Sequence, residues 1–170
     1  MTWLWIGNAR PEHARAVVAL DRATAHSAWP ADRLRAACEA GADVDVPGDA
    51  PADAPAGAPG HVLVASVDGS PLGFLLYSQV LDEVSILKLA VDPGHRRRGI
   101  ARELLDHLRA LAADGHVRRL LLEVSVANRP ALGLYDGAGF TVDGRRPGYY
   151  SGDSEPEDAL LMSLSLGDAR

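Results

Sequence analysis

The sequence is short of cysteine and of long apolar runs, and each shortage excludes a class of protein. Cys38 is the single cysteine in 170 residues, so an internal disulfide and a thiolate zinc cluster are both excluded. No stretch approaches the roughly 20 apolar residues of a membrane-spanning helix, and the apolar first residues carry no basic leader. We therefore expect a cytoplasmic protein that does not enter a membrane.

An excess of basic residues is missing as well. The formal net charge of −6 argues against a broad basic face that binds nucleic acid or anionic lipid. The six histidines show no metal-ligand spacing, such as two on adjacent helical turns, so we expect no metal. A chain of 170 residues with 47% hydrophobic residues can bury one substantial core but not two. The sequence predicts a single domain over residues 1–170, as a monomer or weak homodimer.

One segment has a composition unlike the rest of the chain. Asp43 to Gly60 is a run of Pro, Ala, Gly and Asp with almost no residue large enough to anchor it in a core. It predicts a flexible low-complexity loop at residues 43–60. The residues before it are too few to fold alone. They indicate a short Trp-rich strand, a helix that begins at Pro11 and a second helix from Pro30 to Ala40.

Strand and helix patterns alternate after this loop. Apolar and alternating runs predict strands at His61 to Val67, Leu72 to Val80, Val84 to Val91, Arg119 to Val126, Phe140 to Tyr150 and Ala159 to Leu166. Ile100 to Ala112 has helical spacing, and a short helix is expected between Asn128 and Gly139. The run from Arg119 is almost wholly apolar. This is typical of a strand that is covered on both faces and is parallel to the strand ending at Val91.

The turn before the Ile100 helix is the most informative stretch. It reads Val91-Asp92-Pro93-Gly94-His95-Arg96-Arg97-Arg98-Gly99-Ile100-Ala101 and joins a buried strand to an amphipathic helix. Amides at a helix start lack internal partners and lie at the positive end of the helix dipole, so they can bind a pyrophosphate. Gly99 would allow a close approach of the backbone, and Ala101 keeps the next turn small. A solvated arginine-rich turn is the alternative interpretation.

The motif Arg96-x-x-Gly99-x-Ala101, following Leu89 to Pro93, resembles the coenzyme A pyrophosphate motif of the GNAT acetyltransferase superfamily. The resemblance covers most of the chain from about residue 81 onward and continues through three further stretches, Leu120 to Asn128, Ala131 to Phe140 and Gly148 to Leu164. It implies an α/β fold with a GNAT-like mixed, mostly antiparallel central sheet. Six to seven strands and about four flanking helices are expected.

Within the superfamily, Tyr149-Tyr150 and Glu157-Asp158-Ala159 look most like the RimI type, the ribosomal-protein alanine N-acetyltransferases. This resemblance implies transfer of acetyl from acetyl-CoA to a primary amine, with the N-terminus of a protein, and a ribosomal protein in particular, as the expected acceptor. The resemblance assigns coenzyme contacts to Leu89, Ala90, Val91, Arg96, Arg97, Arg98, Gly99, Ile100, Ala101, Arg102 and Asn128. Asn128 is equally well explained as a helix cap.

The expected reaction needs a neutral amine, a polarised thioester carbonyl and a proton for the leaving thiolate. Glu123, in an apolar strand, is the predicted general base acting through water, and Tyr135, on the following helix, is the predicted general acid. The resemblance supports both roles. The alternatives are a structural glutamate paired with an arginine and a packed aromatic ring. We expect both side chains to face one cleft, and direct transfer in a ternary complex, because no cysteine lies in these motifs.

Two residues depart from the RimI pattern and leave the acceptor open. Ser125 stands where those enzymes usually have arginine, and Lys88 stands where they usually have asparagine. A small-molecule amine acetyltransferase is therefore the second hypothesis, since one coenzyme site supports many acceptors. A non-catalytic coenzyme A-binding regulatory domain is the third, and its function would survive the loss of Glu123 and Tyr135.

Overall fold

The structure is a computed structural model that describes residues 3–24, 28–41, 60–150 and 155–167. Within these ranges the chain forms seven strands and four α-helices, with short 3₁₀ turns at Pro11–His13 and Pro93–His95. In chain order the elements are β1 (Trp5–Asn8), α1 (Ala14–Thr24), α2 (Ala31–Ala40), β2 (His61–Val67), β3 (Ser70–Val80), β4 (Glu83–Val91), α3 (Ile100–Asp114), β5 (Arg119–Ser125), α4 (Arg129–Gly137), β6 (Thr141–Tyr150) and β7 (Glu157–Ser165). Residues 43–59 of the predicted flexible loop lie outside the described ranges.

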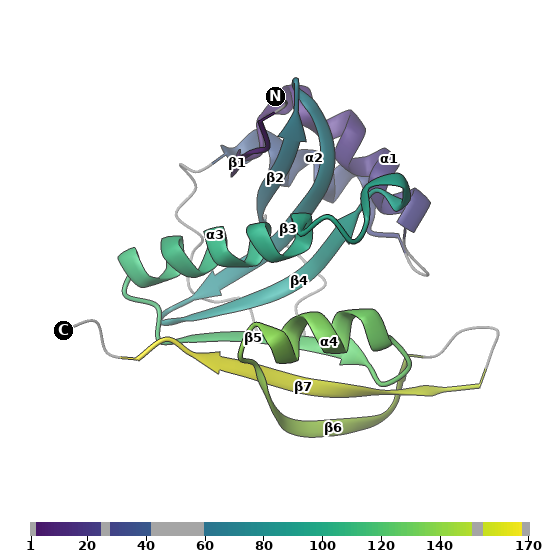
Figure 1. Ribbon diagram of the computed structural model, residues 1–170, viewed down its shortest axis with the longest axis vertical. Helices are drawn as coiled ribbons and strands as arrows, with labels where there is room; N and C mark the ends of the chain where they lie inside the picture. Colours follow the sequence, from purple (N-terminus) through teal and green to yellow (C-terminus); the bar gives the residue numbers. More distant parts are fainter. Residues whose placement is uncertain (1–2, 25–27, 42–59, 151–154, 168–170) are drawn as a thin grey trace.

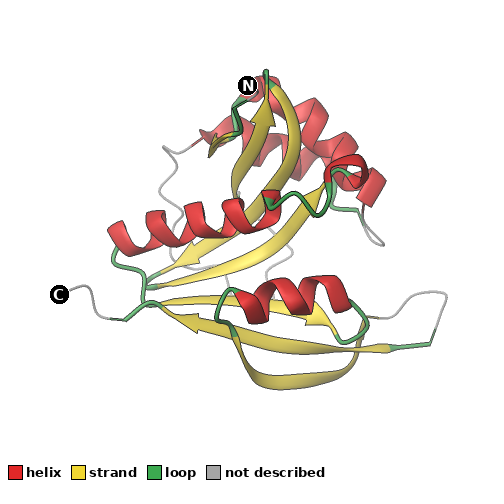
Figure 2. Cartoon of the chain, in the orientation of Figure 1, coloured by secondary structure: helices red, strands yellow, loops and turns green. Residues whose placement is uncertain are grey.

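All seven strands belong to one sheet, in the order β1-β2-β3-β4-β5-β7-β6. The β4–β5 pair is parallel because α3 carries the chain back between them, and every other neighbouring pair is antiparallel. The predicted mixed, mostly antiparallel sheet with about four helices is confirmed. Helices α1 and α2 cover one face, and α3 and α4 cover the other (Figures 1 and 2). Of the helices described, none has both the length and the apolar character to cross a membrane.

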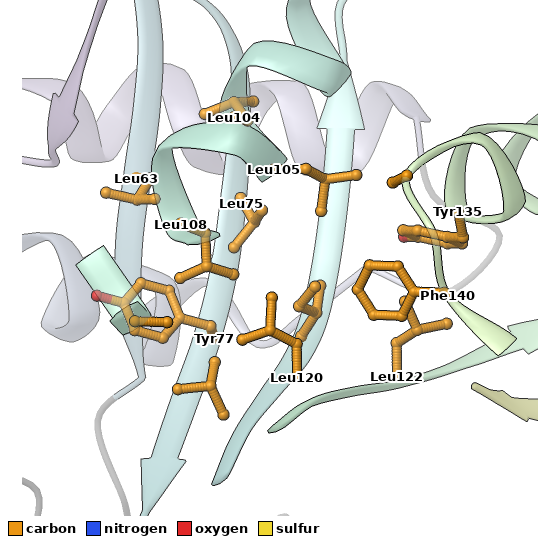
Figure 3. Packing of buried hydrophobic residues seen from close by; sticks show 14 of the residues in the cluster. Leu63, Leu75, Tyr77, Leu104, Leu105, Leu108, Leu120, Leu122, Tyr135 and Phe140 are labelled. Atoms are coloured by element: carbon orange, nitrogen blue, oxygen red, sulfur yellow. The ribbon is translucent and has the colours of Figure 1, made fainter. Parts of the chain in front are cut away.

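The larger core lies between the sheet and the helices α3 and α4. The apolar spacing of α3 turns Leu104, Leu105 and Leu108 toward the sheet, where each is at most 1% exposed. Figure 3 shows these leucines packed against side chains from β2, β3 and β5, with the rings of Tyr135 and Phe140 beside them. A smaller core lies on the opposite face, between β2 to β4 and the helices α1 and α2.

Strand β5 is covered on one face only, so the prediction of a strand buried on both faces was wrong. Its burial alternates along the chain: Leu120, Leu122 and Val124 are buried, while Leu121 and Glu123 between them are half-buried. The predicted parallel pairing with β4 is confirmed. The almost continuous apolar run therefore does not reveal that one face of β5 is buried and the other half-buried. The half-buried face carries Glu123, the only carboxylate of the strand.

Strands β4 and β5 separate halfway along their length. Their ladder runs from Glu83 opposite Arg119 to Ile86 opposite Leu122 and stops there. The register between β3 and β4 shifts at the same level, next to Leu87, which bends β4 away from β5. β5 meanwhile stays paired with β7 as far as Ser125. The two strands diverge beyond this point in Figure 1, and Glu123 lies on β5 just past the last paired residue.

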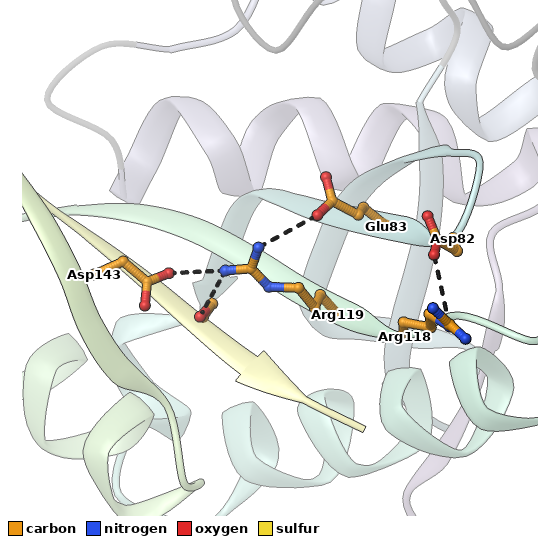
Figure 4. Close-up of polar contacts among 6 residues, drawn as sticks. Asp82, Glu83, Arg118, Arg119 and Asp143 are labelled. Atoms are coloured by element: carbon orange, nitrogen blue, oxygen red, sulfur yellow. Dashed lines mark hydrogen bonds and ion pairs between the residues drawn. The ribbon is translucent and has the colours of Figure 1, made fainter. Parts of the chain in front are cut away.

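The opposite end of this strand pair is held by ionic contacts (Figure 4). The Arg119 guanidinium on β5 lies 3.5 Å from Glu83 on β4 and 3.1 Å from Asp143 on β6, and it donates to the Ser163 hydroxyl on β7 at 3.2 Å. Exposed pairs of this kind each contribute roughly 0–1 kcal/mol. Arg119 therefore joins four strands where β4 and β5 are still paired.

Candidate active site

The turn from β4 into α3 begins as a hydrogen-bonded unit. The Asp92 carboxylate accepts the amide of Gly94 at 3.1 Å, and the same oxygen lies 2.6 Å from Nδ1 of His95. The amide of Asp92 donates to the carbonyl of Leu72 on β3 at 2.8 Å, which anchors the turn to the sheet. The segment after Val91 therefore leaves the sheet along a fixed path.

Gly99 is the N-cap of α3, and its backbone angle explains the glycine. It has φ of +83°, in the left-handed region, while an added Cβ would meet no atom within 4 Å. The backbone conformation by itself therefore favours glycine here, and the close approach of a phosphate stays a prediction. Glycine offers no capping side chain, so the amides of Ile100 and Ala101 remain available at the positive end of the helix.

The three arginines of the turn are exposed around this helix start. Nε of Arg96 donates to the carbonyl of Val91 at 3.3 Å, which holds the first of them against the end of β4. Arg97 has φ of +63°, so the chain reverses direction just before Gly99. Open amides at a helix start with cationic side chains beside them are a suitable environment for a pyrophosphate.

The side chain of Arg102, which was predicted to contact the coenzyme, makes contacts within the protein. Its guanidinium donates to the carbonyl of Gly137 at 2.9 Å and to the carboxylate of Asp106 at 3.1 Å. Arg109, two turns along the same helix, donates to the carbonyl of Ala138 at 3.4 Å. These arginines connect α3 to the carboxyl end of α4. The backbone of Arg102, in contrast, lies in the first turn of α3 beside the predicted phosphate site.

The predicted coenzyme contacts on β4 lie along the edge that no longer pairs with β5. Leu89, Ala90 and Val91 pair with β3 on one side. On the other side, the described ladder between β4 and β5 has already ended at Ile86. Backbone groups of these residues can therefore serve an extended ligand in the way a neighbouring strand would.

Glu123 lies on the half-buried face of β5 and has an arginine partner. Its Oε1 is 3.1 Å from Nη1 of Arg146 on β6, and the two side chains are 29% and 39% exposed. In the ladders, Ser125 is opposite Ala159 of β7, and Ala159 is opposite Arg146. Directly paired residues share a face, so Glu123 and Arg146 lie on the same side of the sheet. The alternative interpretation predicted a glutamate paired with an arginine, and this contact is present between Glu123 and Arg146.

Tyr135 lies on α4 with its ring inside the larger core. It is 7% exposed and packs edge to face against Phe140, with ring centroids 5.6 Å apart. Burial, and secondarily the nearby Tyr150, raises the pKa of Tyr135 above its usual value. The phenol therefore stays protonated over the working range of pH and is available as a proton donor.

The sequence predicted that Glu123 and Tyr135 face one cleft, and this prediction was wrong. The structure places the two side chains on opposite faces of the sheet. Tyr135 belongs to the core that contains Leu122 and Val124, and side chains alternate along a strand, so Glu123 points to the other face. A general base and a general acid could then approach a bound thioester from opposite faces.

Two neighbouring polar residues make local contacts. The Asn128 carboxamide oxygen accepts the amide of Ala131 at 3.2 Å, so Asn128 is the N-cap of α4. Ser125 donates its hydroxyl to Glu157 at 2.5 Å and accepts the amide of Ala127 at 3.0 Å. Ser125 thus fastens the end of β5 to the start of β7.

Arg146 and Tyr150 are site residues that the sequence did not single out for a role. Burial raises the pKa of Tyr150 to about 12, with the charge of Glu123 and then Tyr149 adding to the effect. In the sequence, Tyr150 was notable only as part of the family resemblance. Arg146 could not be distinguished from its neighbour Arg145, which carries the same charge. Strand alternation predicts that one of the two arginines shares the face of Glu123, but only the register identifies which.

Comparison with known proteins agrees with this arrangement. The chain matches the Acetyltransferase (GNAT) family over residues 20–140. It is 36% identical over 99 residues to the [ribosomal protein bS18]-alanine N-acetyltransferase of Escherichia coli K12, which covers 58% of this chain and 67% of that protein. It is also 36% identical over 105 residues to the streptothricin acetyltransferase of Streptomyces lavendulae, with 60% and 56% covered. The crystal structure of the ribosomal-protein-S18-alanine N-acetyltransferase from Escherichia coli has the same fold, with a TM-score of 0.80 and 24% identity over 99% of this chain and 97% of that one.

The fold and the matched residues together define an acyltransferase. The chain belongs to the GNAT acetyltransferase family, which uses acetyl-CoA as co-substrate. The open helix start at Gly99 and the arginines around it fit the phosphates of such a co-substrate. Across the described ranges, no group of three or more His, Cys, Asp or Glu side chains is arranged to hold a metal ion.

Proposed function

We propose that this enzyme transfers the acetyl group of acetyl-CoA directly to the N-terminal α-amine of a protein while both substrates are bound. The observation that carries the proposal is the half-buried Glu123 carboxylate on the part of β5 that β4 no longer pairs with. The similarity to an N-acetyltransferase named for a ribosomal protein supports this class of acceptor. A ribosomal protein N-terminus is therefore the first substrate to test. A cytoplasmic location and a monomeric or weakly dimeric state stay predictions.

The α-amine suits a site with a single modest base. An N-terminal amine has a pKa near ~8 and is already about one-tenth neutral at pH 7, whereas a lysine amine near ~10.4 is almost fully protonated. Glu123 is the proposed acceptor of the remaining proton, through a water molecule. An α-amine therefore asks less of the base than a lysine side chain does.

Each proposed residue has one task in the transfer. The amides of the first turn of α3 and the arginines from Arg96 to Arg98 would hold the co-substrate phosphates. The co-substrate supplies the acetyl thioester. Glu123 accepts, through water, the proton whose loss turns the acceptor ammonium into a neutral amine. The amine nitrogen attacks the thioester carbonyl, the carbon–sulfur bond breaks, and the nitrogen releases a second proton as it becomes an amide. Tyr135, kept protonated by burial, donates a proton to the departing thiolate. The second proton from the nitrogen replaces the one that Tyr135 gives to the thiolate.

The test is acetylation of a set of N-terminal peptides, including peptides that begin with alanine, followed by mass spectrometry to locate the acetyl group. We expect α-amine acetylation of at least one peptide and no acetylation of the same peptide with a blocked N-terminus. A library that stays unmodified while a free small amine reacts would reject the protein acceptor. Labelled acetyl-CoA added to a cell lysate with the enzyme would then identify the natural acceptor.

A small-molecule amine is the second candidate acceptor. Its support is the match to streptothricin acetyltransferase, at the same 36% identity as the match to the ribosomal-protein enzyme. Ser125 and Lys88 differ from the RimI pattern, so the acceptor side of the site is where the two candidates would diverge. Relative values of kcat/KM for a peptide and for small amines decide between them.

A further inference from the structure

The contact between Glu123 and Arg146 raises a question about acceptor charge, and the inference drawn from it rests on the proposed function. A carboxylate placed to receive a proton from an amine already has a cation 3.1 Å away, on a different strand. The same guanidinium lies over the ring of Tyr149, 5.2 Å from its centroid. Arg146 therefore has a carboxylate on one side and an aromatic face on the other.

The backbone of β6 fixes Arg146 in this place. Between Arg146 and Tyr150, the β6–β7 ladder is irregular: three residues of β6 stand against one residue of β7, Asp158. The Asp158 carboxylate accepts the amide of Gly148 at 2.8 Å and Nε of Arg145 at 2.5 Å. These hydrogen bonds lower the pKa of Asp158, so the fastening persists at acidic pH. The contacts of Asp158 therefore hold the bulge of β6 from one face of the sheet, and Arg146 lies on the other face.

The charge near Glu123 matters because the acceptor amine arrives as an ammonium ion. An isolated carboxylate next to an ammonium ion stabilises it and raises its pKa, whereas a nearby cation lowers the pKa of the amine. Without Arg146, the predicted base would hold the acceptor in the protonated, unreactive form. With Arg146 in contact, the guanidinium offsets the charge of the carboxylate.

We propose that Arg146 is a positioning residue that balances the charge of Glu123, so that the acceptor amine is bound without being held as an ammonium ion. In this role the guanidinium contacts Oε1 of Glu123 from the β6 side, and the carboxylate takes the proton through water. The effect is electrostatic and depends on the cation, not on the shape of the guanidinium.

Other ionisable side chains on the neighbouring strands have contacts of their own. On β4, Lys88 is paired with Asp21 of α1 at 2.9 Å, and on β7, Glu157 accepts the hydroxyl of Ser125. Tyr149 and Tyr150 lie on β6 and Tyr135 lies on α4. With the pKa of Tyr150 raised to about 12 and that of Tyr135 raised as well, neither phenol titrates in the range where the acceptor amine does. A change in the pH profile near the amine pKa can therefore be assigned to Arg146.

The test compares pH profiles of kcat for the wild type, Arg146→Gln and Arg146→Lys with an alanine-starting peptide and with a small amine. We expect Arg146→Gln to move the acid limb of kcat upward by about one pH unit, which is roughly a tenfold loss at pH 7. The variants should converge at about pH 10, where the amine is neutral, and KM at pH 7 should fall or stay unchanged. Arg146→Lys should restore most of the loss.

Arg119→Gln is the matched control for this experiment. Arg119 is a cation of similar exposure, 42% against 39%, and its contacts are with Glu83 and Asp143 at the closed end of β5. Its removal changes the net charge by the same amount and should leave the acid limb in place. If Arg146→Gln lowers kcat equally at every pH, or if Arg119→Gln shifts the limb as much, the charge-balancing role is rejected.

A binding experiment keeps the inference testable without turnover. Calorimetry at pH 6.5 in the presence of coenzyme A would compare an alanine-starting peptide with its N-acetylated copy. We expect Arg146→Gln to bind the free-amine peptide several-fold more tightly and the acetylated copy unchanged, because only the first carries a charge. Equal changes for the two peptides, or none, overturn the role of Arg146. Failure of the wild type to acetylate any peptide rejects the proposed acceptor instead, and the small amine then reports on Arg146.

Discussion

Each end of β5 has an arginine–carboxylate contact, and the two contacts have different surroundings. At the start of the strand, Arg119 meets Glu83 and Asp143 where β4 is still paired with β5. At the other end, Glu123 meets Arg146 where β4 has left. The arginines are similarly exposed, so exposure does not distinguish the pairs. The course of β4 does, because it determines which carboxylate lies on a part of β5 that β4 no longer pairs with.

The largest expected effect comes from Glu123→Gln. Removing the predicted base should lower kcat by roughly a hundredfold to a thousandfold at pH 7, as is usual for loss of a general base. Glu83→Gln removes the carboxylate at the closed end and should change kcat less than about twofold, because its partner Arg119 keeps Asp143. Steady-state kinetics on both variants test the comparison. Equal losses of kcat in the two variants would mean that the separation of β4 from β5 does not distinguish Glu123 from Glu83.

A third pair, between Lys88 and Asp21, distinguishes the effect of burial from that of the separation of β4 from β5. Asp21 is 1% exposed and lies 2.9 Å from Lys88, and its other oxygen accepts the amide of Trp29 at 2.7 Å. Lys88→Met leaves this carboxylate buried without its cation and should lower the free energy of unfolding by about 3 kcal/mol. Urea denaturation measures the change.

The control for this pair is Arg118→Gln. Arg118 lies 3.8 Å from Asp82, and the two side chains are 66% and 51% exposed. The expected change in the free energy of unfolding is within about 0.5 kcal/mol. A loss from Lys88→Met as small as that of the control would contradict the view that burial decides the cost of breaking an ion pair here.

Tyr135→Phe should have a smaller kinetic effect than Glu123→Gln. A thiolate leaves readily because a thiol has a pKa near ~8.5, so losing the predicted proton donor should lower kcat by roughly tenfold to a hundredfold. Because burial raises the pKa of Tyr135, wild-type kcat should show no alkaline loss from this group below about pH 10. Tyr77→Phe alters another buried tyrosine of the same core, and unchanged kcat is expected. Similar losses in both would indicate a packing role for Tyr135.

The smallest effect is expected at the start of α3. Gly99→Ala forces a side chain into φ of +83° and should cost about 1 kcal/mol of stability while raising KM for acetyl-CoA several-fold. Gly69→Ala, at φ of +78° in the β2–β3 turn and equally free of steric contact, should cost similar stability with KM unchanged. If KM rises equally in both, the helix start has no special part in binding the co-substrate.

Much of the fold follows from local patterns. The helix α3 and the strands on either side of it were predicted within a few residues, because apolar spacing and the arginine-rich turn are local features. The parallel pairing of β5 was predicted from its apolar run and is confirmed, although the premise that both faces of the strand are buried was wrong. The face of β5 that carries Glu123 was not predicted, because an apolar run does not reveal which of its residues the helices cover.

The sequence contains a signal for Asp21 that was overlooked. Asp21 follows Val17 and Val18 by four and three residues, so it lies on the buried stripe of α1. A carboxylate on such a stripe predicts a buried partner, and Lys88 is that partner. No comparable signal exists for Arg146, because Arg145 beside it is an equal candidate until the register is known.

By itself, the sequence determined the alternation of strands and helices, the arginine-rich turn before α3 and the family resemblance, since these depend on residues close together in the chain. Only the tertiary structure decided that Glu123 and Tyr135 approach from opposite faces and that Arg146 accompanies the carboxylate. The reason is geometric. A strand shows two faces and two edges, and how much of an edge stays unpaired depends on where its neighbour bends away, at Ile86 and Leu87.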